Sequence, residues 1–335
     1  MPGVRITTPN KKLIVSIGSA LVDILIREDD AFLENTCVPK GGMTLVDHDY
    51  IQQTLLLTKN TPHIVPGGSA CNTAIGIAKL GGNARFIGKL GRDDLGRLFE
   101  AGLQKNRVEP ILFRSHLPTG RVLSVITPDA QRSMLTYLGA SAETLPEELS
   151  GTSLTEASIV HIEGYLLFNR DLILAALKSA KKAGAMISLD LASFTVVRDT
   201  KKFLKEIVPE YVDILIANED EALAFTGIDN ERNALEKLAE HTTIAALKVG
   251  KRGSFIFHDS QIIPIDPIGS GNAVDTTGAG DLWASGFLFG LVNNFPLEKC
   301  GALGSACGYE VCQVMGASIP DAGWDRIKSA FETIL

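Results

Sequence analysis

The sequence predicts an α/β fold in which a mostly parallel β-sheet lies between two layers of helices, with a smaller sheet beside it. Short β-branched runs alternate along the chain with segments that have the 3.6-residue period of a helix, and this βαβ alternation is typical of a parallel sheet. Extended segments that interrupt the alternation predict the smaller sheet. The chain has 335 residues, 45% of them hydrophobic, and can therefore bury a large core.

The strands of the main sheet are predicted from six short apolar runs, and helices follow several of them. One helix is predicted to end at Gly81-Gly82 and another at Gly184, because apolar residues recur at helical spacing up to those glycines. The predicted strands are residues 13–17, 85–89, 159–162, 186–189, 214–217 and 244–249.

The smaller sheet is predicted from two regions. Residues 21–26 and 44–46 have an extended pattern, and residues 122–126 and 134–138 flank a turn-like segment as in a hairpin. We expect a single domain, residues 1–335, that carries a lid built from about residues 20–50 and 112–140. The outer face of such a lid could pair two copies, so the sequence is compatible with a monomer or a homodimer.

The composition excludes several classes of partner. The formal net charge is −7 and the chain has no block rich in Lys and Arg, which argues against a nucleic-acid partner. The N-terminus lacks the apolar region of a signal peptide, and the most apolar predicted helix, residues 282–292, is too short to cross a membrane. We expect a cytoplasmic protein without a membrane partner, whose cysteines are reduced and buried. These cysteines, which have no CxxC spacing, are Cys37, Cys71, Cys300, Cys307 and Cys312.

The most informative motif is Asp-Thr-Thr-Gly-Ala-Gly-Asp at residues 275–281, directly before a long apolar helix. A turn with so little side-chain bulk lets backbone N–H groups converge on an anion, and the positive end of the following helix dipole strengthens the binding. Asp281 does not fit simple anion binding, because a carboxylate repels phosphate. Its position suggests proton chemistry beside the bound anion.

A second motif, Gly67-Gly68-Ser69 followed by Asn72, opens another predicted helix. The glycines allow a ligand to approach the backbone, Ser69 can cap the helix, and the Asn72 amide can both donate and accept hydrogen bonds. The motif suits a hydroxyl-rich ligand. An ordinary glycine-rich turn explains it equally well.

Two further motifs follow predicted strands. Asn218 and Glu221 lie three residues apart, on one face of a helix, and suit a hydrated Mg²⁺; alternatively, Asn218 is a helix N-cap with acidic residues in the first turn. Lys248, Gly250 and Gly253 could admit the phosphates or ribose of a nucleotide, or form only a β-turn.

The order and spacing of these motifs resemble the ribokinase-like, PfkB-type family of small-molecule kinases. The resemblance extends from about residue 13 to residue 319, and the motif at residues 275–281 is its most specific part. It implies a ribokinase-like three-layer α/β/α sandwich and transfer of a phosphoryl group from ATP to a hydroxyl of a small molecule.

The resemblance also implies a role for each motif. Asp281 would be the base that takes the proton of the acceptor hydroxyl, and the N–H groups of Gly278, Ala279 and Gly280 would hold the transferring phosphoryl group. Mg²⁺ would be organised through water by Asn218 and Glu221. The implied nucleotide site comprises Asn218, Lys248, Gly250, Gly253, Thr277 and Ser305, and the implied monovalent-cation site, for example for K⁺, comprises Asp275, Thr277, Gly316 and Ser318.

The acceptor site implied by the resemblance lies under the lid. Asp23 matches the family carboxylate that binds substrate hydroxyls, although it could be a solvated acid at a strand end. Glu163 stands where some sugar kinases have a carboxylate near the phosphates, although it could cap a helix. The full implied acceptor site is Asp23, Gly67, Gly68, Asn72, Arg132, Glu163 and Tyr165.

The acceptor itself stays open between two branches of the family. The stretches around residues 18–24, 131–141 and 162–168 are similar to adenosine kinases, in which Arg132 and Tyr165 would contact an anion and stack on a base. Ser19 and Thr277 depart from that branch, and the second Thr is common in sugar kinases. A nucleoside or a ribose-like sugar is favoured. The alternatives are another carbohydrate of the ribose, fructose or ketodeoxygluconate type and, more remotely, a non-catalytic ligand-binding protein.

Overall fold

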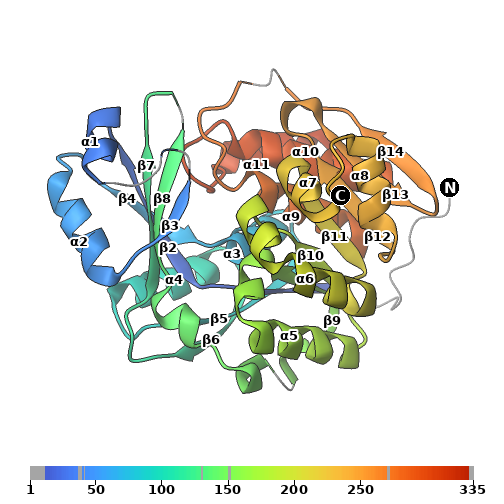
Figure 1. The fold of residues 1–335 in the computed structure, drawn as a ribbon, viewed down its shortest axis with the longest axis horizontal. Coiled ribbons are helices and arrows are strands. Elements are labelled where there is room, and N and C mark those ends of the chain that lie inside the picture. Colours follow the sequence, from blue (N-terminus) through green and yellow to red (C-terminus); the bar gives the residue numbers. More distant parts are fainter. Residues whose placement is uncertain are drawn as a thin grey trace.

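The computed structural model describes residues 12–36, 40, 42–129, 131–149, 152–269 and 272–331. Their strands form two sheets (Figure 1). The nine-stranded sheet has the order β14-β13-β12-β11-β10-β9-β1-β5-β6. All its strands run parallel except β13 and β14, which form an antiparallel extension at one edge. Its strands are β1 (Leu13–Ile17), β5 (Asn83–Leu90), β6 (Glu109–Arg114), β9 (Ala157–Glu163), β10 (Met186–Asp190), β11 (Ile214–Asn218), β12 (Ile244–Lys248), β13 (Ser254–His258) and β14 (Gln261–Ile265).

Helices cover both faces of this sheet and complete the three predicted layers. Because side chains alternate along a strand, Ile14 points to one face of β1 and Val15 to the other, and each enters a separate core. The Val15 face packs against α5 (Arg170–Lys182), α6 (Phe194–Tyr211), α7 (Glu219–Thr226) and α8 (Glu231–Ala239). The Ile14 face packs against α3 (Ser69–Lys79), α4 (Asp94–Lys105), α9 (Ala279–Val292) and α10 (Leu297–Val311), with α11 (Asp321–Ala330) packed outside them.

The smaller sheet stands beside the main one, at the left of Figure 1. It has the order β3-β8-β7-β2-β4. Its strands are β2 (Leu21–Arg27), β3 (Met43–Leu45), β4 (His63–Gly67), β7 (Gly120–Ile126) and β8 (Arg132–Tyr137), and its outer face is covered by α1 (Asp30–Asn35) and α2 (His48–Leu57). Short 3₁₀ helices connect other elements: η1 (Gly139–Glu143), η2 (Pro146–Leu149), η3 (Thr152–Leu154), η4 (Gly164–Phe168) and η5 (Gly250–Arg252).

The extent of the small sheet differs from the expected residues in two places. Residues 112–114 belong to β6 and pair with β5 in the main sheet, because their apolar run continues the βα alternation through α4. Residues 63–67 form β4 and pair with β2, although their Pro-Gly-Gly ending suggests only a turn. Residues 37–39 and 41, within the expected lid, lie outside the described part of the chain.

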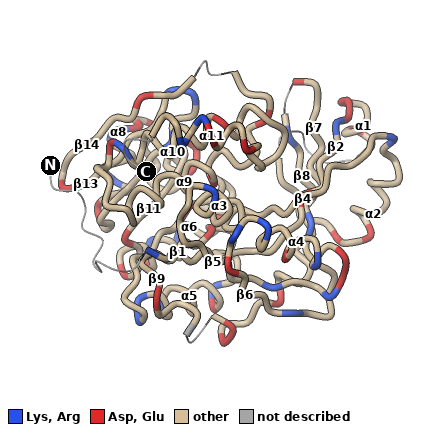
Figure 2. Tube along the Cα trace, turned by 180° about the vertical axis from the view of Figure 1, so that it is seen from behind, with Lys and Arg blue, Asp and Glu red and all other residues tan. Residues whose placement is uncertain are grey.

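Four of the five cysteines lie in the described part of the chain, and three of them are buried as expected. Cys71, Cys300 and Cys307 are buried free thiols and Cys312 is partly buried, while Cys37 lies outside the described residues. Across the described ranges, the structure contains no helix that is both long enough and apolar enough for a membrane span. Acidic and basic residues are interspersed along the back of the molecule (Figure 2).

The topology places a row of polar side chains at one edge of the main sheet. Glu163, Asp190, Asn218 and Lys248 are the last residues of β9, β10, β11 and β12, which are neighbours in the sheet. The carboxyl ends of parallel strands are where α/β sheets bind their ligands. This edge is therefore where a site is expected.

Candidate active site

Two cavities meet above this edge of the sheet. The first, of about 500 Å³, lies between the small sheet and the carboxyl ends of the strands. The second, of about 450 Å³, lies among the turn after β12, residues 267–268, residues 272–273 and α10. Their shared wall is formed by Asn218, Lys248, Thr276, Ala279 and Gly280. A ligand in one cavity can therefore meet a ligand in the other at the start of α9.

The predicted anion-binding turn is formed at the start of α9. Gly278 is the N-cap with a left-handed φ of 74°, and α9 begins at Ala279 with Asp281 in its first turn. No side chain caps this helix. The Ala279 N–H donates to the Thr276 carbonyl at 3.2 Å, and the next N–H groups are left available to an anion. A Cβ atom on Gly280 would lie 3.0 Å from the Lys248 Nζ atom, so the ammonium group lies directly beside the helix start.

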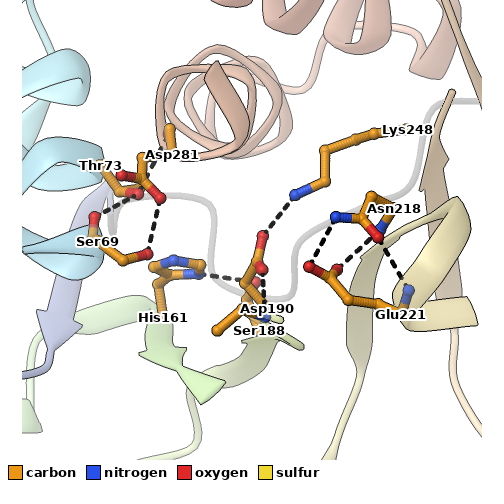
Figure 3. A network of polar contacts seen from close by, with 10 residues as sticks. Ser69, Thr73, His161, Ser188, Asp190, Asn218, Glu221, Lys248 and Asp281 are labelled. Atoms are coloured by element: carbon orange, nitrogen blue, oxygen red, sulfur yellow. Dashed lines mark hydrogen bonds and ion pairs between the residues drawn. The ribbon is translucent and has the colours of Figure 1, made fainter. Parts of the chain in front are cut away.

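Asp281 faces the first cavity and is held by two residues of α3, of which Figure 3 labels Ser69. The Ser69 hydroxyl donates to its Oδ1 at 2.7 Å, and the Asn72 amide donates to its Oδ2 at 2.9 Å. Thr73 donates to its backbone carbonyl at 3.1 Å. Burial raises the pKa of Asp281 above its usual value, although the bonds from Asn72 and Ser69 oppose the shift. The carboxylate is therefore fixed in position and more basic than an exposed one.

Asp23 lies on β2, in the small sheet, and lines the same cavity. Burial raises its pKa to about 7, with Arg132 acting against the shift and Asp281 adding to it. A Cβ atom on Gly67 would overlap the Asp23 carboxyl group, so this close approach requires glycine. Asp23 is therefore a buried acid within β2 and not a solvated acid at a strand end.

Glu163 also lines the first cavity but is only 1% exposed. Its Oε1 accepts from the Ser19 N–H at 2.7 Å and its Oε2 from the Ala70 N–H at 3.0 Å. Burial raises its pKa to about 7 against the effect of these bonds. Tyr165, in η4, lies along the same wall, and burial raises the pKa of its phenol.

Lys248 and Asp190, at the ends of β12 and β10, form a largely buried ion pair, with Nζ and Oδ2 2.9 Å apart (Figure 3). Burial alone would lower the pKa of Lys248, but the attraction of Asp190 and Glu221 outweighs it and the pKa is raised. Burial would raise the pKa of Asp190, but Lys248 outweighs that effect and lowers it. Both groups are therefore charged. Asp190 could not be recognised as a site residue from the sequence, because it is a single acid at a strand end without a motif around it.

Asn218 and Glu221 form a capping box at the start of α7. The Glu221 N–H donates to Asn218 Oδ1 at 2.9 Å, and both Glu221 oxygens accept from Asn218. Burial raises the pKa of Glu221 to about 7, against the effect of Lys248. The capping alternative is thus present in the structure. The capping box still allows Glu221 to bind a metal ion through water, since each carboxylate oxygen has a second lone pair.

The residues around the shared wall fit a hydrated Mg²⁺ better than a dehydrated metal. Within the described ranges, the structure has no group of three or more His, Cys, Asp or Glu side chains placed to hold a metal. Mg²⁺ keeps several waters and binds through one or two carboxylates together with substrate phosphates. Glu221 and Asn218 are compatible with that arrangement.

Asp275 and Thr277 connect the turn before α9 to the segment after α10. The Thr277 N–H and hydroxyl donate to Asp275 Oδ1 at 2.9 and 2.7 Å, and the Gly316 N–H donates to Asp275 Oδ2 at 2.8 Å. Ser318 follows in the same segment with an exposed side chain. The buried Thr277 hydroxyl is thus directed at Asp275, which makes it part of the framework of the turn.

The second cavity brings together the residues expected to bind a nucleotide except Thr277, which lines only the first cavity. Gly250 and Gly253 line one side and Ser305, on α10, lines the other. Side chains that the motifs did not indicate also line it. Among them are Asn272 before α9, Trp283 in α9, Tyr309 in α10 and Gln313 just after α10.

Known proteins with this architecture include kinases for different acceptors. The crystal structure of adenosine kinase from Sinorhizobium meliloti has a TM-score of 0.88 and 33% sequence identity, covering 96% of this chain and 99% of that chain. A probable sugar kinase protein from Rhizobium etli CFN 42 has a TM-score of 0.89 and 32% identity with the same coverage. A 5-dehydro-2-deoxygluconokinase from Geobacillus thermodenitrificans (strain NG80-2) is 28% identical over 303 residues, 86% of this chain and 88% of the relative.

The family model described as pfkB family carbohydrate kinase matches residues 11–322, nearly the whole chain. The resemblance inferred from the motifs and the ribokinase-like fold are thereby confirmed. The chain belongs to the pfkB family of carbohydrate kinases and is a phosphotransferase that acts on a hydroxyl group.

Proposed function

We propose that the protein transfers the γ-phosphate of ATP to a hydroxyl of a nucleoside or a ribose-like sugar. The observation that carries this proposal is the position of Asp281, which faces the first cavity at the point where the second cavity adjoins it. The acceptor would occupy the first cavity and ATP the second. Their reacting groups would then meet at the start of α9.

In the proposed reaction, Asp281 takes the proton of the acceptor hydroxyl as the oxygen attacks the γ-phosphorus. The bond between the γ-phosphorus and the oxygen bridging it to the β-phosphate breaks, and ADP leaves. Gly278, Ala279 and Gly280 offer N–H groups to the transferring phosphoryl group, and Lys248 adds a positive charge beside them. The raised pKa of Asp281 suits a base that works near neutral pH.

Two ions belong to this proposal. Asn218 and Glu221 would hold the waters of a Mg²⁺ ion, which neutralises charge on the ATP phosphates when bound. Asp275, Thr277, Gly316 and Ser318 would surround a monovalent cation such as K⁺ and would hold the turn before α9 in shape.

The proposed acceptor class follows from the wall of the first cavity. Asp23 and Asn72 supply polar groups for hydroxyls at one end, close to Gly67 and Gly68. Tyr165 and an apolar set from the small sheet and nearby segments line the rest, which suits a flat ring such as a nucleobase. This apolar set is Met43, Leu45, Val122, Met134, Leu138 and Phe168.

A second candidate acceptor is an acidic sugar of the ketodeoxygluconate type. Arg132 lines the first cavity, and its guanidinium would bind a carboxylate or phosphate on the acceptor. Fructose remains a neutral alternative.

We also propose that the small sheet acts as a lid over the acceptor. Its inner face lines the first cavity while its outer face packs against α1 and α2. Closure over the acceptor would exclude water and protect ATP from hydrolysis.

The test is ATP consumption by the purified protein with adenosine, inosine, cytidine, ribose, fructose phosphates and ketodeoxygluconate, each with and without K⁺. Consumption with nucleosides or ribose supports the proposal, and consumption with ketodeoxygluconate alone supports the second candidate. If no acceptor supports turnover while ligands still bind, the protein is a binding protein on this fold.

A further inference from the structure

Glu163 is buried at the junction of the two sheets, and its two oxygens bind different connections between them. Ser19 belongs to the short connection from β1 of the main sheet to β2 of the small sheet. Ala70 lies in the first turn of α3, directly after the connection from β4. The two connections are neighbours, because Leu21 pairs with Gly67. A single carboxylate from β9 therefore holds both.

The first turn of α3 depends on this carboxylate. Its N-cap, Gly68, has no side chain to cap the helix, so the N–H groups that begin the helix have no local side-chain acceptor. Glu163 supplies one from 93 residues away, as a negative charge at the positive end of the helix dipole. The fit is close, because a Cβ atom on Gly18 would overlap the Glu163 carboxyl group.

The held elements carry the two aspartates of the acceptor site. Ser69 and Asn72, in the first turn of α3, bind Asp281 at 2.7 and 2.9 Å. Asp23 lies on β2, four residues after Ser19, and packs against Gly67. A shift of the α3 start or of the β1–β2 connection would therefore change the separation between Asp23 and Asp281.

We infer that Glu163 is a positioning residue, which sets the separation between Asp23 and Asp281 by holding Ser19 and Ala70, and that it does not bind the acceptor or the phosphates. The bonds from Ser19 and Ala70 to its two oxygens and its close fit against Gly18 support this role. The inference relies on the proposed function only for the roles of Asp23 and Asp281; the link made by Glu163 is a feature of the fold.

The first test is amide hydrogen exchange in the protein without ligands. In Glu163→Gln, one acceptor oxygen is replaced by an amide group that cannot accept, so we expect the Ser19 or Ala70 N–H to exchange roughly 10- to 100-fold faster. Asp213→Asn is the matched control, because Asp213 accepts from the Ile187 N–H at 2.8 Å at the opposite end of the strands. That control should leave Ser19 and Ala70 unchanged.

The second test separates positioning from binding. With an acceptor that supports turnover, Glu163→Gln should lower kcat at least roughly 10-fold, because Asp281 would be displaced from the acceptor hydroxyl. It should leave the Kd for ATP unchanged. Unchanged exchange together with a raised acceptor KM would overturn the inference and make Glu163 an acceptor ligand. If no acceptor is found, the exchange result still decides the inference independently of the proposed function.

Two further measurements cover the case in which Glu163→Gln does not fold. Gly18→Ala should displace the carboxylate and speed exchange at the same amides. In the wild type, the Ser19 and Ala70 N–H groups should exchange as slowly as strand amides, although they lie outside the strand ladders. Fast exchange of both in the folded wild type contradicts the inference.

Discussion

The two cavities of this kinase are built in different ways. The first is lined by charged side chains brought together from distant parts of the chain. Asp23 and Glu163 lie buried there, Asp281 is partly buried, and all three have raised pKa values. The second is lined largely by glycines, backbone and uncharged side chains at residues 250–253, 267–268 and 272–273 and along α10. The first cavity therefore holds groups whose charge is costly to bury, which is typical of sites that carry out chemistry.

The contrast has a physical meaning for each ligand. A nucleotide is a large ligand that close backbone approach can accommodate. An acceptor hydroxyl must instead be deprotonated at one place, and this requires a basic carboxylate held in a fixed position. Lys248 lies in the shared wall and lines both cavities. Variants of residues in each cavity test whether the two cavities work independently.

The largest effect is expected from Asp281→Asn, which removes the base and keeps the shape of the side chain. We expect kcat to fall about 10³- to 10⁴-fold, because general-base catalysis contributes on this scale. ATP binding, measured by Trp283 fluorescence in a Trp324→Phe background, should be unchanged, since Trp283 lines the second cavity and Trp324 is buried in α11. A fall of less than tenfold would assign the proton transfer to another group.

Lys248→Met should lower both kcat and the stability of the fold. We expect kcat to fall about 10²-fold through loss of charge stabilisation, and the free energy of unfolding to fall by about 3 to 5 kcal/mol because Asp190 is left buried and unpaired. Adding Asp190→Asn should restore much of the stability but not kcat. Recovery of kcat in the double variant would reduce Lys248 to a structural partner of Asp190.

The buried acids of the first cavity predict a pH-dependent stability. The pKa of Asp23 is raised from 3.8 to about 7 in the folded state, so its contribution is fully present below pH 3.8 and is lost as the pH rises through 7. Between pH 5.5 and pH 7.5 we expect a loss on the order of 2 kcal/mol from this group, at about 1.4 kcal/mol per pKa unit. Glu163 acts in the same direction.

Urea unfolding at the two pH values measures this effect. Asp23→Asn should reduce the pH dependence, whereas Asp325→Asn, at an exposed position of α11, should leave it unchanged. Equal pH dependence in the wild type and in Asp23→Asn would show that Asp23 is ionised in the folded protein at both pH values.

The smallest effect on catalysis is expected at Thr277. Thr277→Val removes the hydroxyl that donates to Asp275, so we expect a loss of about 1.5 to 3 kcal/mol of stability and only a few-fold change in kcat. Thr277→Asn, which keeps a donor, should lie between this variant and the wild type. The ranking of acceptors should be the same in all three. A change in that ranking would show that Thr277 contacts the acceptor.

Much of this arrangement could be predicted from the sequence because it is local. The alternation of strands and helices gave the main sheet, and the run at residues 275–281 gave the turn before α9, since each depends on neighbouring residues. Asp190 and the contacts of Glu163 could not be predicted in this way. They depend on partners 58 to 144 residues away, whose approach is fixed by strand order and register. The strand at residues 63–67 was missed because its Pro-Gly ending conceals its pairing with β2.

An acceptor in the first cavity should meet ATP from the second cavity at Asp281. The most direct measurement is a crystal structure with a non-hydrolysable ATP analogue, Mg²⁺ and an acceptor found in the activity screen. We predict an acceptor hydroxyl about 2.6 to 3.2 Å from the Asp281 carboxylate, and the γ-phosphate at the N–H groups that begin α9. An acceptor whose hydroxyls all lie away from Asp281, or a γ-phosphate bound away from α9, would contradict the account.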